Sequence, residues 1–309
     1  MNFDNALICE LSHYAVLGCA GDDAQSFLQA QLTNDVSEVN LTTSQLTAYC
    51  TPKGRMLASF LLWQASGGYC LQLPVSLADS ILERLRRFVL RSEVELSRAN
   101  FSCFGLAGKD AEELLRSIVS STPRSAYEVS QGGKATLIRL SENRFQIVAQ
   151  TQSSVWNELQ SNAKVVGKEY WDWLKIRDGI PVILPQTQEQ FVPQMVNFEV
   201  IGGVSFEKGC YPGQEIVARA KYRGQIKRRM YLAHIASDTA PQPADEVYGD
   251  ELQDQAAGMI VNSAANPEGG YDVLAVVQTS SVDSGVRWKS REGSPLNFLP
   301  LPYALPSSF

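Results

Sequence analysis

Hydrophobic positions in the first part of the chain change between strand-like and helix-like spacing. Residues 14–19 form a short apolar run typical of a strand. An acidic turn at 21–23 precedes apolar residues at helical spacing, which predicts a capped helix ending near 33–35. Strands are predicted at 46–50, 56–63 and 69–73, and an amphipathic helix follows with its apolar face at Leu77, Ile81, Leu85, Phe88 and Val89.

The same mixed pattern continues to about residue 163 and changes after residue 227. The middle of the chain predicts strands at 93–96, 101–104, 136–140 and 145–149 and helices at 110–119 and 153–161. After residue 227, short apolar runs are separated by Pro, Gly, Asp and Ser, which predicts a small all-β barrel or sandwich. Because hairpins lie between the helices, the fold class is α+β and not a doubly wound parallel sheet.

Length and composition indicate the number of domains and the sign of the net charge. The chain has 309 residues, enough for two or three domains, with 44% hydrophobic and 19% charged residues. Its formal net charge of −6 argues against a protein that coats nucleic acid nonspecifically, because phosphate binding needs clustered Lys and Arg.

The cysteines argue against a metal centre and against secretion. The chain has six cysteines and two histidines, and no cysteine pair has CxxC spacing, so we expect neither zinc nor an iron–sulfur cluster held by this chain alone. No signal peptide and no membrane-spanning run is visible in the sequence. These features predict a reduced, cytoplasmic protein.

The segment Lys208-Gly-Cys-Tyr-Pro-Gly-Gln-Glu215 is the most informative. It predicts that Cys210 stands just before a short helix at 214–220, near unpaired N–H groups and the Lys208 ammonium, conditions that favour a thiolate. The alternative is that Cys210 is an inert packing residue, and local features alone favour that reading. Glu215 and Arg219, four residues apart, are more simply explained by a helix-surface ion pair than by a catalytic pair.

With Arg219 one turn further on, this segment resembles the signature of the YgfZ family, which shares the fold of the glycine-cleavage aminomethyltransferase. Further matches lie in order along nearly the whole chain, which makes a chance resemblance very improbable. They are Gly21–Ala24, Gln31–Asp35, Pro52–Arg55, Ile176–Pro181, Phe191–Met195, Tyr222–Gly224 and Pro300–Tyr303.

The resemblance implies three domains around a channel that holds tetrahydrofolate or a one-carbon derivative of it. It implies a role in making or repairing iron–sulfur clusters for partner enzymes, including one that thiolates tRNA. It assigns Cys210 as the reactive thiol with Lys208 beside it, and Gln214, Glu215 and Arg219 to the folate site.

Two aromatic positions associated with folate in the family fall on Tyr14 and Trp171. Tyr14 stands where the family usually has Trp, and Trp173 is the alternative to Trp171 if the register differs. Without the resemblance, core packing is the simpler reading of both tryptophans.

The first alternative function is that of a folate-dependent aminomethyltransferase. That relative carries adjacent aspartates after a Gly-rich turn, whereas residues 55–59 of this chain read Arg-Met-Leu-Ala-Ser and contain no carboxylate. Acid–base or electrostatic catalysis at an iminium centre needs such a group, so the sequence argues against glycine cleavage.

The second alternative is a nucleic-acid-binding module, because six basic residues lie between Arg219 and Arg229. The acidic net charge favours a solvated or folate-facing role for this segment over contact with tRNA.

We expect a folate-binding core at 1–44 and 164–226, an inserted ferredoxin-like region at 45–163 and the β-barrel at 227–309. The expected partners are folate and iron–sulfur enzymes or assembly proteins, with no membrane, and the chain is expected to be a monomer. Whether the protein turns over a substrate is left open.

Overall fold

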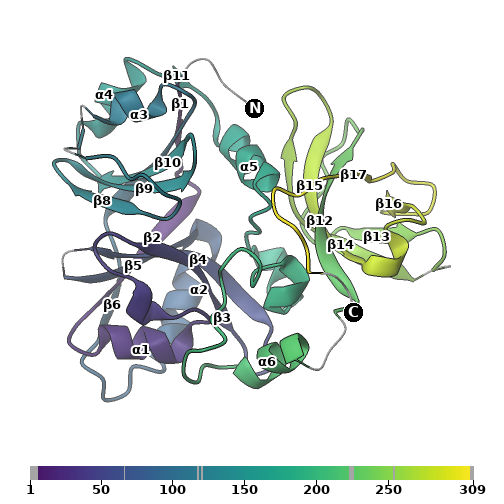
Figure 1. The fold of residues 1–309 in the computed structure, drawn as a ribbon, viewed down its shortest axis with the longest axis horizontal. Coiled ribbons are helices and arrows are strands. Elements are labelled where there is room, and N and C mark those ends of the chain that lie inside the picture. Colours follow the sequence, from purple (N-terminus) through teal and green to yellow (C-terminus); the bar gives the residue numbers. More distant parts are fainter. Residues whose placement is uncertain are drawn as a thin grey trace. The chain divides into compact units, whose positions relative to one another are not determined.

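The computed structural model describes residues 6–65, 67–116, 118–119, 121–222, 226–252 and 255–306. The chain divides into two compact units, of which the first comprises 1–30, 35–47 and 60–168, and the second 31–34, 48–59 and 169–309. The chain passes from one unit to the other within strands β3 (Ser44–Cys50) and β4 (Met56–Ala65), so neither unit is one continuous stretch (Figure 1).

A five-stranded sheet has the order β3-β4-β5-β2-β6. Its other strands are β2 (Tyr14–Ala20), β5 (Gly68–Pro74) and β6 (Glu95–Arg98), and the helices that follow β2 and β5 are α1 (Ala24–Gln31) and α2 (Val75–Arg86).

Helix α2 packs on β2, β5 and β6 and buries Leu77, Ile81 and Leu85, as the apolar spacing predicts. The predicted extension to Val89 is wrong, because α2 ends at Arg86. After Arg86 the backbone N–H groups bond to the carbonyl three residues earlier, as in a 3-10 turn, and the Phe88 side chain is exposed.

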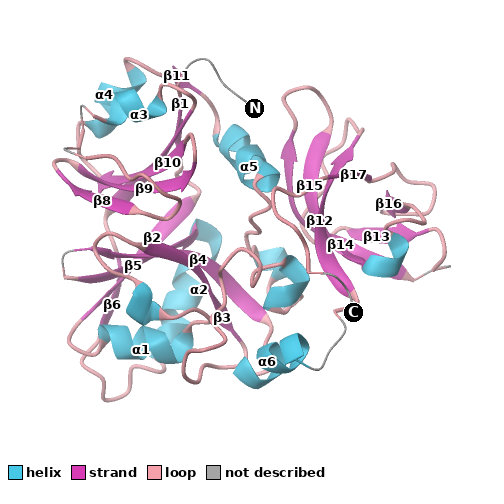
Figure 2. Ribbon diagram, in the orientation of Figure 1, coloured by secondary structure: helices cyan, strands magenta, loops and turns pink. Residues whose placement is uncertain are grey.

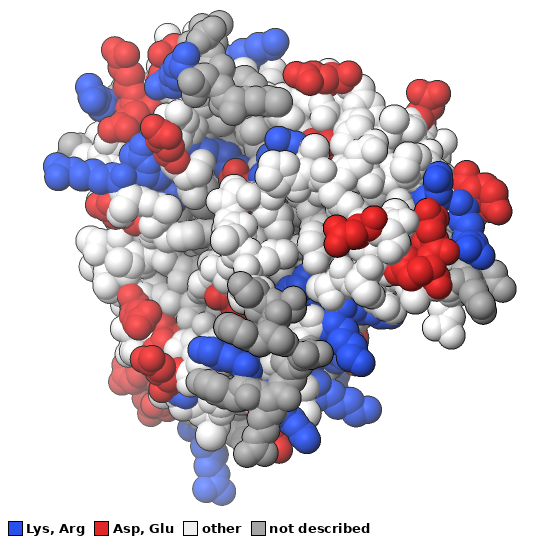
Figure 3. All heavy atoms as spheres, turned by 45° about the vertical axis from the view of Figure 1, so that its right-hand side comes forward, with Lys and Arg blue, Asp and Glu red and all other residues white. Residues whose placement is uncertain are grey.

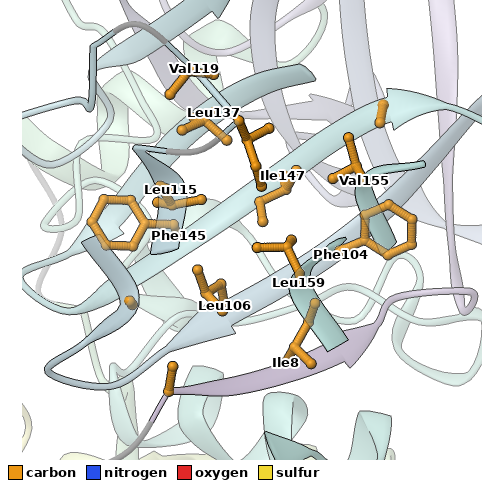
Figure 4. Close-up of a cluster of buried hydrophobic side chains, with 14 residues drawn as sticks. Ile8, Phe104, Leu106, Leu115, Val119, Leu137, Phe145, Ile147, Val155 and Leu159 are labelled. Atoms are coloured by element: carbon orange, nitrogen blue, oxygen red, sulfur yellow. The ribbon is translucent and has the colours of Figure 1, made fainter. Parts of the chain in front are cut away.

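The first unit contains a second sheet, of order β11-β1-β7-β10-β9-β8, in which β1 and β11 are parallel and all other neighbouring strands are antiparallel. Its strands are β1 (Leu7–Glu10), β7 (Phe101–Ala107), β8 (Val129–Gly132), β9 (Ala135–Ser141), β10 (Arg144–Gln150) and β11 (Lys164–Val165), with helices α3 (Ala111–Leu115) and α4 (Val155–Gln160). Alternate residues of β7 and β10 meet side chains of both helices in one hydrophobic core (Figure 4).

The second unit ends in an antiparallel sheet of order β16-β13-β14-β15-β12-β17. Its strands are β12 (Arg228–Ile235), β13 (Glu246–Gly249), β14 (Ala256–Ala265), β15 (Tyr271–Gln278), β16 (Val286–Trp288) and β17 (Asn297–Leu299). The strand pattern after residue 227 is thus confirmed, and Figure 2 shows the sheet in magenta.

Helices α5 (Lys168–Arg177) and α6 (Gln214–Tyr222) also belong to the second unit. Between them the chain is largely irregular, with two 3-10 turns, η2 (Pro185–Thr187) and η3 (Pro193–Val196). The start of α6 at Gln214 is as the sequence predicts.

The molecule is of the α+β class, as predicted from the order of the elements. The division into core, inserted region and C-terminal barrel stays a prediction. No helix in the described part of the chain has the length and apolar character needed to cross a bilayer.

Candidate functional site

Cys210 lies in an irregular loop directly before α6, and it is exposed. The other five cysteines are buried. Burial raises the pKa of Cys19, Cys50, Cys70 and Cys103 to about 12, which suppresses their thiolates at neutral pH. Solvent therefore has access to one thiol of the six.

Lys208 is only 6% exposed, although it lies two residues before the exposed cysteine. Its Nζ donates hydrogen bonds to Leu32 O at 2.7 Å and to Asn34 O at 3.0 Å, and it lies 5.3 Å from the centroid of the Tyr211 ring. The ammonium expected beside the thiol is thus bound to backbone carbonyls of the 31–34 segment. Lys208 positions the loop through these contacts.

Side chains and backbone of the 31–34 segment hold the beginning of the same loop. Thr33 Oγ1 donates to Gly203 O at 2.8 Å, and Asn34 Nδ2 donates to Gly202 O at 2.7 Å. The Ser205 N–H donates to Thr33 O at 3.0 Å. The sequence indicated only that a helix ends near residues 33–35. It gave no sign that the polar groups of this segment form hydrogen bonds with a loop 170 residues away in sequence.

A close approach of two turns fixes the other end of the loop. Gly213 has φ +84°, and a Cβ placed on it would lie 2.5 Å from Thr51 O and 2.6 Å from Gly54 N. Gly54 has φ +70°. The Pro-Lys-Gly turn at 52–54 is therefore packed directly against the start of α6. Only glycine tolerates both this backbone conformation and this close approach.

The remaining candidates of the signature lie on α6. The side chain of Gln214 donates from Nε2 to Lys208 O at 3.3 Å, so it supports the loop. Glu215 and Arg219 are exposed, and no ion pair joins them in the described structure.

The aromatic candidates lie in different units. Trp171 and Trp173 belong to α5 and are buried, and Trp173 Nε1 donates to Asp272 Oδ2 at 2.9 Å. Tyr14 begins β2 in the first unit, where its ring lies 4.3 Å from that of His13. Contact of Tyr14 and Trp171 with folate stays a prediction.

Asp272 organises a polar cluster that the sequence reasoning missed. The residue is fully buried and accepts hydrogen bonds from Trp173, from His234 Nδ1 at 2.9 Å and from Asn266 at 3.0 Å, with Arg177 at 3.4 Å. Burial alone raises the pKa of this carboxyl, but the hydrogen bonds and the Arg177 charge outweigh burial and leave the pKa lowered. A single carboxylate in an otherwise apolar strand was the available signal, because a buried charge requires partners.

The basic residues between 219 and 229 differ in how far they are buried. Arg219, Lys221 and Lys227 are exposed, whereas Arg229 is 8% exposed and forms an ion pair with Glu199. Arg229 therefore does not belong to the solvated surface. Arg223, Gly224 and the side chain of Tyr222 lie outside the described residues.

No group of three or more His, Cys, Asp or Glu side chains suited to a metal ion occurs among the residues that the structure describes. The arrangement offers instead an accessible thiol on a loop that is fixed at both ends.

Comparison with known proteins finds a matching family model and a solved structure of similar fold. A family model described as the GCVT N-terminal domain matches residues 3–132. In fold the chain is similar to the glycine cleavage system aminomethyltransferase T from Bartonella henselae, with a TM-score of 0.80 at 15% identity over 97% of this chain and 87% of that one.

Two curated relatives are similar over nearly their whole length, and both are called tRNA-modifying protein YgfZ. The protein from Vibrio atlanticus is 32% identical over 97% of this chain and 93% of its own length, and that from Cronobacter sakazakii is 30% identical over 96% and 93%. The chain therefore belongs to the family of the tRNA-modifying protein YgfZ.

Proposed function

We propose that this protein binds tetrahydrofolate or a one-carbon derivative and supports tRNA modification by assisting the assembly or repair of iron–sulfur clusters, with Cys210 as its reactive thiol. The tRNA role comes from the name of the relatives. The folate and iron–sulfur roles come from the resemblance of the signature at 208–215 to this family.

The observation that carries the proposal is the contrast between Cys210 and the other cysteines. An inert cysteine is usually buried, as the remaining five are, whereas Cys210 is exposed on a loop fixed by the buried ammonium of Lys208. A fixed, accessible thiol is suited to attack or to bind a group presented by a partner. One thiolate does not hold a cluster alone, so any cluster at this site is shared with a partner or passes through it.

The residues proposed to contact folate are Trp171, Tyr14, Gln214, Glu215 and Arg219. Gly209 fits this arrangement, because a Cβ at that position would meet no atom within 4 Å, which leaves space next to Cys210. The open side of Gly209 supports access of a ligand to the loop.

An aminomethyltransferase reaction is not supported by the residues that follow the Gly54 turn. Met56, Leu57, Ala58 and Ser59 are buried in β4, and Ser59 Oγ accepts a hydrogen bond from the Ile183 N–H. No carboxylate stands in this stretch for chemistry at an iminium centre.

Calorimetric titration with tetrahydrofolate tests the folate part of the proposal. We expect the wild type and Cys210→Ala to bind and Trp171→Leu to lose at least tenfold in affinity. Trp156→Leu, a partly buried tryptophan of the first unit, is the matched control and is expected to bind normally. Absence of binding by the wild type contradicts the folate role.

Complementation of a bacterial strain that lacks its own copy tests the thiol. Cys210→Ala is expected to abolish the rescue of tRNA modification at unchanged protein level, and Ser205→Ala, on the same loop, to retain it. Full rescue by Cys210→Ala would show that the function does not require the Cys210 thiol.

A further inference from the structure

Cationic side chains lie on three neighbouring segments of the second unit. Lys53 is in the turn before β4, Arg219 and Lys221 are on α6, and Lys227 and Arg228 stand where β12 begins. All are exposed except Arg228, which is half-buried. We call these five residues the basic face.

The fold brings these segments together although 160 residues separate the turn from the helix. A Cβ on Gly54 would lie 3.1 Å from Ile216 Cβ, so the turn lies against the first part of α6. Gln194 connects α6 to β12, because its Nε2 donates to Val217 O at 2.6 Å and its carbonyl accepts from Arg229 at 2.9 Å. Figure 3 shows several Lys and Arg side chains, in blue, in the lower part of the face that it presents.

Four of the five cations of this face form no ion pair in the described part of the chain, and the fifth, Lys221, has its Nζ 3.9 Å from the centroid of the Phe206 ring. In the described part of the chain no ion pair holds Lys53, Arg219, Lys227 or Arg228, in contrast to the buried pair of Arg229 with Glu199. Unpaired exposed cations on neighbouring elements produce a positive potential even when the whole chain is acidic. The exposed carboxylates on these segments are Glu207 and Glu215, two against five cations.

We infer that the basic face is a docking surface for the phosphate backbone of an RNA, and that it holds a tRNA beside the exposed thiol of Cys210. The inference rests on the proposed function, since it names the macromolecule presented at that same loop. Cys210 belongs to the loop that leads directly into α6, so a strand bound along the helix passes the thiol.

The chemistry of the face favours RNA over an acidic protein. A stable protein interface has an apolar centre, and Ile216 is the only large hydrophobic residue on these segments that is exposed in the described structure. Long cationic side chains without an apolar centre are suited to a polyanionic backbone, where binding comes from release of counterions.

Fluorescence anisotropy of a labelled tRNA transcript, titrated with the protein between 50 and 200 mM salt, tests the inference. The protein concentrations are extended high enough to measure weak binding. The variant carries Lys53→Gln, Lys221→Gln, Lys227→Gln and Arg228→Gln. We expect the variant to bind the transcript at least tenfold more weakly than the wild type. The slope of the logarithm of the association constant against the logarithm of the salt concentration should become less steep by about 3, because each lost phosphate contact removes about 0.7 to 0.9 from its magnitude.

The matched control removes the same four positive charges from exposed positions of the first unit, by Arg87→Gln, Arg91→Gln, Arg116→Gln and Lys164→Gln. We expect this control to keep the wild-type slope, and both variants to keep the wild-type circular dichroism spectrum. Absence of RNA binding by the wild type, or an equal loss in variant and control, overturns the inference. Competition by poly-L-glutamate as strong as that by RNA also overturns it and assigns the face to an acidic protein.

The same proteins separate this inference from the function on which it rests. Tetrahydrofolate binding, measured on the four-residue variant, is expected to equal that of the wild type. If RNA binding is absent while folate binding and Cys210-dependent rescue persist, the docking surface alone is wrong. If the wild type binds no folate, the proposed function fails whatever the RNA result.

Discussion

At the scale of single residues, burial gives six chemically equal cysteines different reactivities. A thiolate buried among apolar side chains loses its hydration, and this cost raises the pKa of the thiol. Cys103, in β7 of the first unit, and Cys50, in β3, both reach about 12 for this reason. The Cys210 side chain, in contrast to the other five, is exposed to solvent.

This difference predicts the outcome of thiol labelling. The native protein is expected to react with one equivalent of a maleimide at neutral pH, and the unfolded chain with six. Cys210→Ser is expected to leave the native protein unlabelled, while Cys103→Ser leaves the count at one. Mass spectrometry of the intact protein gives the number, and native labelling of a second cysteine would contradict the assignment.

A second prediction at this scale concerns Asp272. Removing its charge by Asp272→Asn leaves donors without a charged acceptor, and we expect a loss of about 3 kcal/mol in the free energy of unfolding. Asp250→Asn is the control, because Asp250 is half-exposed and lies 3.6 Å from Arg287, and it should cost less than about 1 kcal/mol.

The lowered pKa of Asp272 also fixes the sign of its pH dependence. The folded pKa lies below the unfolded one, so this stabilisation is complete above the unfolded pKa and is lost as the pH falls through the folded pKa. Urea unfolding at a series of acidic pH values should show a smaller acid-side loss in Asp272→Asn than in the wild type. Parallel curves would show that the carboxylate does not contribute.

At the scale of elements, the loop before α6 depends on glycine at one position and not at the other. Gly213→Ala is expected to destabilise the protein by about 2 kcal/mol or more, because it combines a positive φ with a collision against the Thr51 turn. Gly209→Ala is the matched change, with open space around the added methyl group, and should stay within about 0.5 kcal/mol. Thermal unfolding measures both, and equal effects would disprove the packing of the two turns.

The elements themselves could be predicted where one face is clearly apolar. The strand at 271–277 and the helix that buries Leu77, Ile81 and Leu85 follow from period alone. Helix α5 was missed, since its tryptophans are buried against partners distant in sequence and give no clean apolar stripe. Strand β13 was not predicted, because the Pro and Asp residues that precede it dominate the local signal.

At the scale of the whole molecule, the second unit is assembled from separated pieces of sequence. The segments 31–34 and 48–59 belong to it and supply the acceptors of Lys208 and the partner turn of Gly213. We therefore expect a fragment of residues 169–309 to lack the cooperative unfolding of the full chain, because a buried ammonium would remain without its acceptors.

Amide dispersion in a heteronuclear NMR spectrum of this fragment checks the expectation against the full chain. The resonances of the loop at 202–213 should be the most affected, while a native-like spectrum throughout the fragment would show that the two short segments are dispensable.

The sequence by itself determined the α+β class, the strand-rich C-terminal part and the family, and it singled out Cys210 as the candidate thiol. Period, turn residues and a local signature are properties of neighbouring residues and need no tertiary contact. Only the tertiary structure decided that Lys208 holds the 31–34 segment, that Asp272 accepts from four donors, that Arg229 is buried and that the Gly54 turn lies against α6. These are contacts between residues far apart along the chain, and hydrogen-bond partners and burial depend on distances that a linear pattern does not contain.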